Sequence, residues 1–232
     1  MNIMKNTPSL FGGHPELVKS VHRRSFLKWA GGTAAVTTLV LTGCKEDETT
    51  PVVGEVNLGT GDIAVLNYAY ALEQLEAAFY TRVIESQFSG ITADEIALLT
   101  DIRDHEVAHR EFFKAALGSN AIGGLDVDFS SINFGSRESV LNTAKTFEDL
   151  GVAAYNGAGR FITSPDYLTL AGKIVSVEAR HAAYIRDLLS NGTFADNTVV
   201  DSNGLEMSKD PAAVLQAAAP FIKNTINASA LA

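Results

Sequence analysis

Cysteine, proline and basic charge are scarce in this chain of 232 residues. The single cysteine, Cys44, excludes an intrachain disulfide and a cysteine-based metal cluster. Only three of the six prolines follow residue 51, and 46% of the residues are hydrophobic. This composition favours a helical globular protein over a disordered one, and the length fits one sizeable domain plus an export segment.

Basic side chains are concentrated at the N-terminus. Residues 1–44 hold five Lys or Arg against one acidic residue, whereas the remainder holds 13 basic and 26 acidic side chains, a net charge of −13. A body this acidic would be repelled by the phosphate backbone of DNA or RNA, so we expect no nucleic acid partner.

The first 43 residues have the pattern of a signal peptide. The uncharged run from Trp29 to Gly43 is too short for a comfortable membrane span. The run RRSFLK (residues 23–28) resembles the twin-arginine consensus, and the run LTGC (residues 41–44) resembles the lipobox of bacterial lipoproteins. The resemblance implies twin-arginine export and a lipid anchor on Cys44, with the body facing the periplasm or cell surface. An uncleaved anchor helix is the alternative.

Residues 44–61 are polar and punctuated by Gly and Pro, so we expect a flexible tether there. Beyond it, apolar residues recur at helical spacing in four long segments. The expected helices cover residues 62–88, 92–117, 136–161 and 164–190, followed by a shorter one over 211–226.

Local signals support these helix boundaries. Asp62 is a candidate N-cap, Thr92 and Glu95 have capping-box form, and Pro165 suits a first helical position. The Gly- and Ser-rich residues 118–136 form a connection long enough to cross a bundle. The sequence therefore predicts an all-α antiparallel four-helix bundle with one long crossover over residues 62–190, and a C-terminal extension over 191–232.

Ionisable residues interrupt the apolar stripe of every long helix. Burying a charge costs several kcal/mol unless the charge is paired or bound to a metal. Two of the helices carry Glu-x-x-His, which places both side chains on one side of the helix. The six residues are Glu73, Glu106, His109, Glu148, Glu178 and His181.

The same residues form an internal repeat. Tyr80 follows Glu73 by seven residues, and Tyr155 follows Glu148 by seven. With turns in the middle of the two short connections, the glutamates of neighbouring antiparallel helices lie at one level. The two tyrosines either pack in the core with satisfied hydroxyls, or have a redox role or a role in supporting the ligands.

This arrangement resembles the ferritin-like di-iron carboxylate family, in which two helices give one Glu each and two others give Glu-x-x-His. The segment LNYAYALEQLEAAFY (residues 66–80) is also similar to the first helix of bacterial ferritin-like proteins of unassigned role, including some called desiccation-related. The resemblance implies that Glu73, rather than Glu76, is a ligand. It also implies that Glu106 and Glu178 bridge two metals.

Five further acidic residues of the helices are assigned to solvated faces, and His105 is expected to be exposed, away from the ligands. These acidic residues are Glu76, Glu85, Glu95, Glu111 and Asp149.

Four carboxylates match the charge of two divalent cations, so two metal ions are expected. Oxygen and imidazole donors suit iron, which we favour, or manganese, with zinc as a further occupant. The leading hypothesis is redox chemistry of a di-iron centre with dioxygen or peroxide. The alternatives are peroxide disproportionation at a di-manganese centre and a non-catalytic surface protein stapled by metal. A homodimer is compatible with the sequence.

Overall fold

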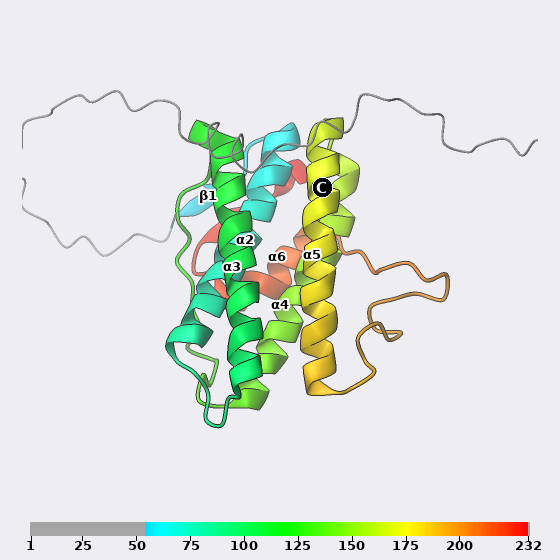
Figure 1. Ribbon diagram of the computed structural model, residues 1–232. Helices are drawn as coiled ribbons and strands as arrows, with labels where there is room; N and C mark the ends of the chain where they lie inside the picture. The colour runs from blue at the N-terminus through cyan, green and yellow to red at the C-terminus, as the bar shows by residue number, and fades with distance from the viewer. Residues whose placement is uncertain (1–53, 232) are drawn as a thin grey trace, which may run out of the picture. The chain divides into compact units, whose positions relative to one another are not determined.

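Four long helices form the body of the protein (Figure 1): α2 (Gly61–Glu85), α3 (Ala93–Leu117), α4 (Arg137–Ala158) and α5 (Pro165–Leu189). The computed structural model describes residues 54–231. Helix α2 packs mainly against α3, and α4 against α5. Short connections make each of these pairs antiparallel, so the predicted all-α bundle is confirmed. Within the described residues, no helix has the length and apolarity needed to cross a membrane.

Side-chain caps define where the helices begin. The Thr92 side chain accepts a hydrogen bond from the Glu95 amide, and the Glu95 carboxylate accepts one from the Thr92 backbone amide, which confirms the capping box. Pro165 occupies the first turn of α5 as predicted. The predicted cap Asp62 is wrong, because Thr60 is the N-cap of α2. The Asp62 carboxylate instead accepts hydrogen bonds from the backbone of the α4–α5 turn.

The long connection between α3 and α4 runs along α2 and covers residues 118–136, as expected. Asn67 of α2 is buried and donates to the Leu58 and Asn120 carbonyls, and its Oδ1 accepts from the Ile122 amide. Further along, Gln74 accepts from the Leu125 amide. These side-chain bonds satisfy the polar backbone of a segment that forms little regular structure of its own.

Residues 55–61, before the predicted boundary at residue 62, already belong to the folded body. Strand β1 (Glu55–Asn57) pairs in parallel with β2 (Thr225–Asn227), and Leu58 is buried in the core. The prediction of a flexible tether is therefore wrong for residues 55–61. The predicted signal peptide and Cys44 lie outside the described residues.

The C-terminal extension belongs to the same core as the bundle. The fifth helix, α6 (Pro211–Ala218), ends eight residues earlier than predicted and is followed by a short 3-10 turn and β2. Val214 is buried, and the Phe221 ring packs edge-on against Phe147 of α4 with centroids 4.8 Å apart. Gly157 lets this segment approach, because a Cβ there would lie 1.8 Å from the Lys209 carbonyl oxygen.

Candidate metal centre

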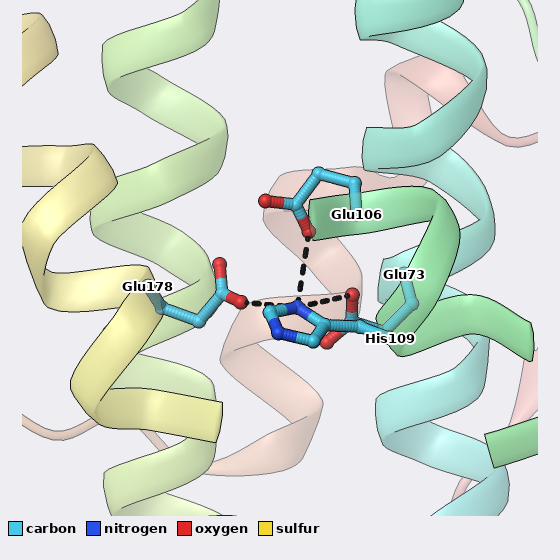
Figure 2. A group of neighbouring side chains, drawn as sticks. All are labelled: Glu73, Glu106, His109 and Glu178. Carbon is cyan, nitrogen blue, oxygen red and sulfur yellow. Dashed lines mark ion pairs between the residues drawn. The ribbon is translucent and has the colours of Figure 1, made fainter. Parts of the chain in front are cut away.

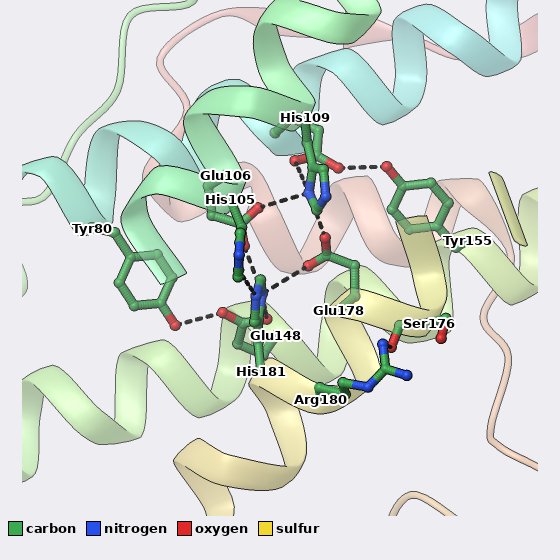
Figure 3. Close-up of polar contacts among 11 residues, drawn as sticks. Tyr80, His105, Glu106, His109, Glu148, Tyr155, Ser176, Glu178, Arg180 and His181 are labelled. Carbon is green, nitrogen blue, oxygen red and sulfur yellow. Dashed lines mark hydrogen bonds and ion pairs between the residues drawn. The ribbon is translucent and has the colours of Figure 1, made fainter. Parts of the chain in front are cut away.

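All six predicted ligands meet in the middle of the bundle. The four glutamates are fully buried, and the two histidines lie between them (Figure 3). They form two overlapping groups in which the donor atoms lie within 4.8 Å of one another. The first group is Glu73, Glu106, His109 and Glu178 (Figure 2), and the second is Glu106, Glu148, Glu178 and His181.

His109 lies at the centre of the first group. Its Nδ1 is 2.8 Å from Glu178 Oε1, 3.5 Å from Glu73 Oε2 and 3.6 Å from Glu106 Oε2. The three carboxylates come from α5, α2 and α3, so the group forms only when the bundle closes.

His181 has the same place in the second group. Its Nδ1 is 2.8 Å from Glu106 Oε1, 3.5 Å from Glu148 Oε2 and 3.7 Å from Glu178 Oε2. Glu106 and Glu178 therefore each turn one oxygen toward His109 and the other toward His181. This is the orientation expected of carboxylates that bridge two metal ions.

Several donor atoms of these residues make no hydrogen bond and fit a pair of cations, although the 2.8 Å approach of each histidine Nδ1 to a carboxylate oxygen is an ion pair when the imidazole is protonated. Within residues 54–231, nine buried side-chain atoms lack a hydrogen-bond partner, and eight of them belong to the six predicted ligands. They include both oxygens of the two shared glutamates and the Nδ1 atom of each histidine. Buried carboxylate oxygens without donors are costly, and a cation satisfies several of them at once. The oxygen and nitrogen donors match iron, manganese or zinc.

Two tyrosines hold the remaining oxygens of the unshared glutamates. The Tyr80 hydroxyl donates to Glu148 Oε1 at 2.6 Å (Figure 3). The Tyr155 hydroxyl donates to Glu73 Oε1. In the sequence, Tyr80 follows Glu73 and Tyr155 follows Glu148, but in the structure each tyrosine hydrogen-bonds the glutamate of the other pair. The hydrogen bonds fix the carboxylate planes, so each glutamate turns its second oxygen toward the histidines.

His105 contacts the site, whereas the sequence predicted that it would lie away from the ligands. It is exposed as predicted, but its Nδ1 lies 2.9 Å from His181 Nε2. A cation held by His181 Nδ1 would leave the proton on Nε2, from which it would be donated to His105. The four-residue spacing of His105 and His109 places both near one face of α3, which is the signal that could have identified it.

The protonation of the metal-free site follows from burial and crowding. Burial raises the pKa of Glu73, and it raises that of Glu148 to about 8. Burial lowers the pKa of His109 and His181, but the surrounding carboxylates outweigh it and raise both to about 12. Without metal, protonated imidazoles therefore occupy the position that cations would take.

Three of the acidic residues assigned to solvated faces are in fact buried or paired. Glu76 is 3% exposed and lies inside the bundle. Glu95 is buried by its capping role and by an ion pair with Arg137 at 2.7 Å, and Asp149 pairs with the buried Arg186 at 2.9 Å. Only Glu85 and Glu111 are exposed as predicted.

Comparison with known families agrees with this geometry. A twin-arginine translocation pathway signal sequence matches residues 20–40, which confirms that part of the export prediction. A search of curated proteins gives no match. A ferritin-like domain matches residues 61–191, more than half of the chain and the whole of the segment that supplies the six donors. The chain therefore belongs to the ferritin-like family.

Proposed function

We propose that the protein holds two iron ions between Glu73, Glu106, His109, Glu148, Glu178 and His181, and uses them for redox chemistry with dioxygen or peroxide. The main support is the sharing of Glu106 and Glu178 between the two donor groups. Carboxylates shared in this way keep two ions close enough to act together.

Two bound ferrous ions would supply one electron each to the oxidant. With dioxygen, two ferrous ions and two protons give two ferric ions and one hydrogen peroxide. With hydrogen peroxide, the same ions and protons give two ferric ions and two waters. Both reactions would remove ferrous iron, and the second would also consume the peroxide that the first produces, which together give a protective, ferroxidase-like role.

The surrounding residues prepare the donors for this chemistry. The hydroxyls of Tyr80 and Tyr155 orient the two unshared carboxylates, and His105 sets the tautomer of His181. The complete burial of the four glutamates keeps bulk water from competing for the donor atoms. The protein thus contributes a dry, preoriented ligand set.

Iron oxidation tests the proposal directly. Protein loaded anaerobically with two ferrous ions per chain and then mixed with dioxygen or peroxide should oxidise iron faster than buffer or the Glu106→Ala variant. Glu85→Ala, on an exposed position of α2, is the matched control and should behave like the parent. Manganese-loaded protein is assayed in parallel for oxygen evolution from peroxide.

The outcomes separate the three hypotheses. Rapid iron oxidation without oxygen evolution supports the di-iron function. Oxygen evolution from the manganese form alone supports peroxide disproportionation instead. If iron and manganese both bind, but neither iron oxidation nor oxygen evolution is faster than in Glu106→Ala, the bound metals serve only to stabilise the bundle.

We further propose that the protein is exported and anchored by lipid on Cys44. The support is the matched twin-arginine signal, which ends at residue 40, and the LTGC run directly after it. Cys44→Ala should release the body from membranes or stall processing. A variant that fractionates like the parent would contradict the lipid anchor.

A further inference from the structure

Glu76 is a fifth carboxylate buried beside the metal centre. It lies on α2 one turn after Glu73 and faces α4 at Gly151. A Cβ at Gly151 would lie 3.0 Å from Glu76 Oε1, which is closer than such contacts normally are. Gly151 is therefore the position at which α4 leaves room for the carboxylate.

The internal repeat makes this pair of residues informative. The offset of 75 residues that relates Glu73 to Glu148 also relates Glu76 to Gly151. The first copy of the repeat therefore has a carboxylate, Glu76, at the position where the second copy has a glycine, Gly151. Glycine is unfavourable inside a helix, so its presence in α4 is explained by the space that Glu76 needs.

The charge around Glu76 indicates what it could do. In the metal-free protein, burial and the four carboxylates of the centre raise the pKa of Glu76 well above its usual value, which favours its protonated form. The positive charge of bound metal ions acts in the opposite direction and favours the ionised carboxylate. Those four carboxylates balance two divalent ions, but two trivalent ions leave a surplus of two positive charges. A fifth buried carboxylate would be most stabilising in that second state.

We propose that Glu76 adjusts the charge balance of the centre, and that its carboxylate stabilises a trivalent metal pair relative to a divalent pair without ligating either ion. The inference rests on the proposed two-metal centre but not on the proposed reaction with dioxygen or peroxide. Glu76 would thus act on the metal pair through its charge and not as a ligand.

The reduction potential of the iron-loaded protein tests this role. In a mediator titration, oxidation takes one electron from each of two ferrous ions and the mediator accepts both. Glu76→Gln keeps the shape but removes the charge, so the midpoint potential should become more positive. At a fixed solution potential the ferric-to-ferrous ratio should fall by roughly tenfold or more, as expected for one unit charge at an effective dielectric constant of about 20.

Glu85→Gln is the matched control, because it makes the same change at an exposed position of the same helix. It should leave the potential unchanged, and both variants should bind two iron ions per chain. An unchanged potential in Glu76→Gln, or loss of one iron ion, overturns the proposal. Failure of iron oxidation by dioxygen and peroxide would contradict only the proposed function, since mediators still report the potential.

A second experiment tests the packing without metal. If the carboxylate fills the space beside Gly151, Gly151→Ala should lower the melting temperature of metal-free parent protein. In a Glu76→Ala background the same change should raise it, because alanine favours the helix once the space is free. An increase in both backgrounds would show that the carboxylate does not occupy that space.

Discussion

The two halves of the centre have the same donors but different surroundings. Glu148 and His181 are supported by a fully buried tyrosine, Tyr80, and by the imidazole of His105. Among residues 54–231, Tyr155 is the corresponding support of Glu73 and His109, through its hydrogen bond to Glu73. The residue that corresponds to His105 in the repeat is Val177, which directly precedes Glu178 and cannot donate or accept a hydrogen bond through its side chain.

A cavity adds to this difference. Apolar side chains together with Tyr155 line a cavity of about 30 Å³ at the end of the bundle. The Tyr80 ring does not line this cavity and packs edge-on against Phe79, with centroids 5.1 Å apart. The repeat thus gives two similar donor groups, and residues outside the repeated pattern make them inequivalent. Two bound metals are therefore expected to differ in affinity, and the following predictions test this.

The largest effect is expected from the shared carboxylates, which belong to both halves. Glu106→Ala or Glu178→Ala should lower metal content towards one ion per chain and abolish two-electron chemistry, whereas Glu148→Ala should spare the Glu73–His109 group. Metal analysis and iron oxidation measure both results. Retention of two ions in either shared-carboxylate variant would contradict the bridging role.

A second prediction concerns pH and metal removal. Raised pKa values mean that the folded metal-free protein holds protons which the unfolded chain has lost, so its stability should fall as pH rises. For Glu148 the fall spans the range from its ordinary value, 4.5, to about 8, and for the two histidines from 6.5 to about 12. Glu106 acts oppositely, because His109 and His181 outweigh its burial and lower its pKa to about 2, so its contribution is lost only in acid.

Melting curves of metal-free and metal-loaded protein between pH 5 and pH 8 test these opposing contributions to stability. The metal-free melting temperature should decrease across the range, and bound metal should remove most of the decrease. Equal melting temperatures with and without a chelator at neutral pH would show that the six residues are not a metal site.

The tyrosines allow the halves to be tested one at a time. Tyr80→Phe and Tyr155→Phe should each weaken metal binding at one position by about 10- to 100-fold, because one oxygen of the attached carboxylate loses its donor. The structure predicts weaker binding at the Glu148 position for Tyr80→Phe and at the Glu73 position for Tyr155→Phe. Competition binding with a chelator, followed for both ions, measures this. Equal loss at both positions in either variant would contradict a half-specific role.

The smallest effect is expected from His105→Val, which gives α3 the residue that α5 carries at Val177. The exposed imidazole is only partly fixed, so the loss of affinity should be about tenfold at most and confined to the His181 position. The two metal affinities should become more alike. If the variant instead weakens the His109 position, the assignment of His105 to one half is wrong.

The proposed metal ligands were predictable from the sequence because the signals that mark them act over a few residues. Glu-x-x-His fixes a direction on a single helix, and the capping box at Thr92 depends on residues three apart. Glu76 and His105 were misjudged for the opposite reason. Each lies at the edge of a helix face, where the neighbouring helix decides whether the side chain is buried or has a partner.

The sequence by itself determined the helices, the long crossover, the six donors and the twofold pattern behind them, because helical periodicity and turn chemistry act over a few residues. Only the tertiary structure decided that β1 pairs with β2 across the length of the chain, that Glu76 enters the space left by Gly151, and that His105 reaches His181. These contacts join segments far apart in the sequence, and their energies depend on which surfaces the closed bundle brings together.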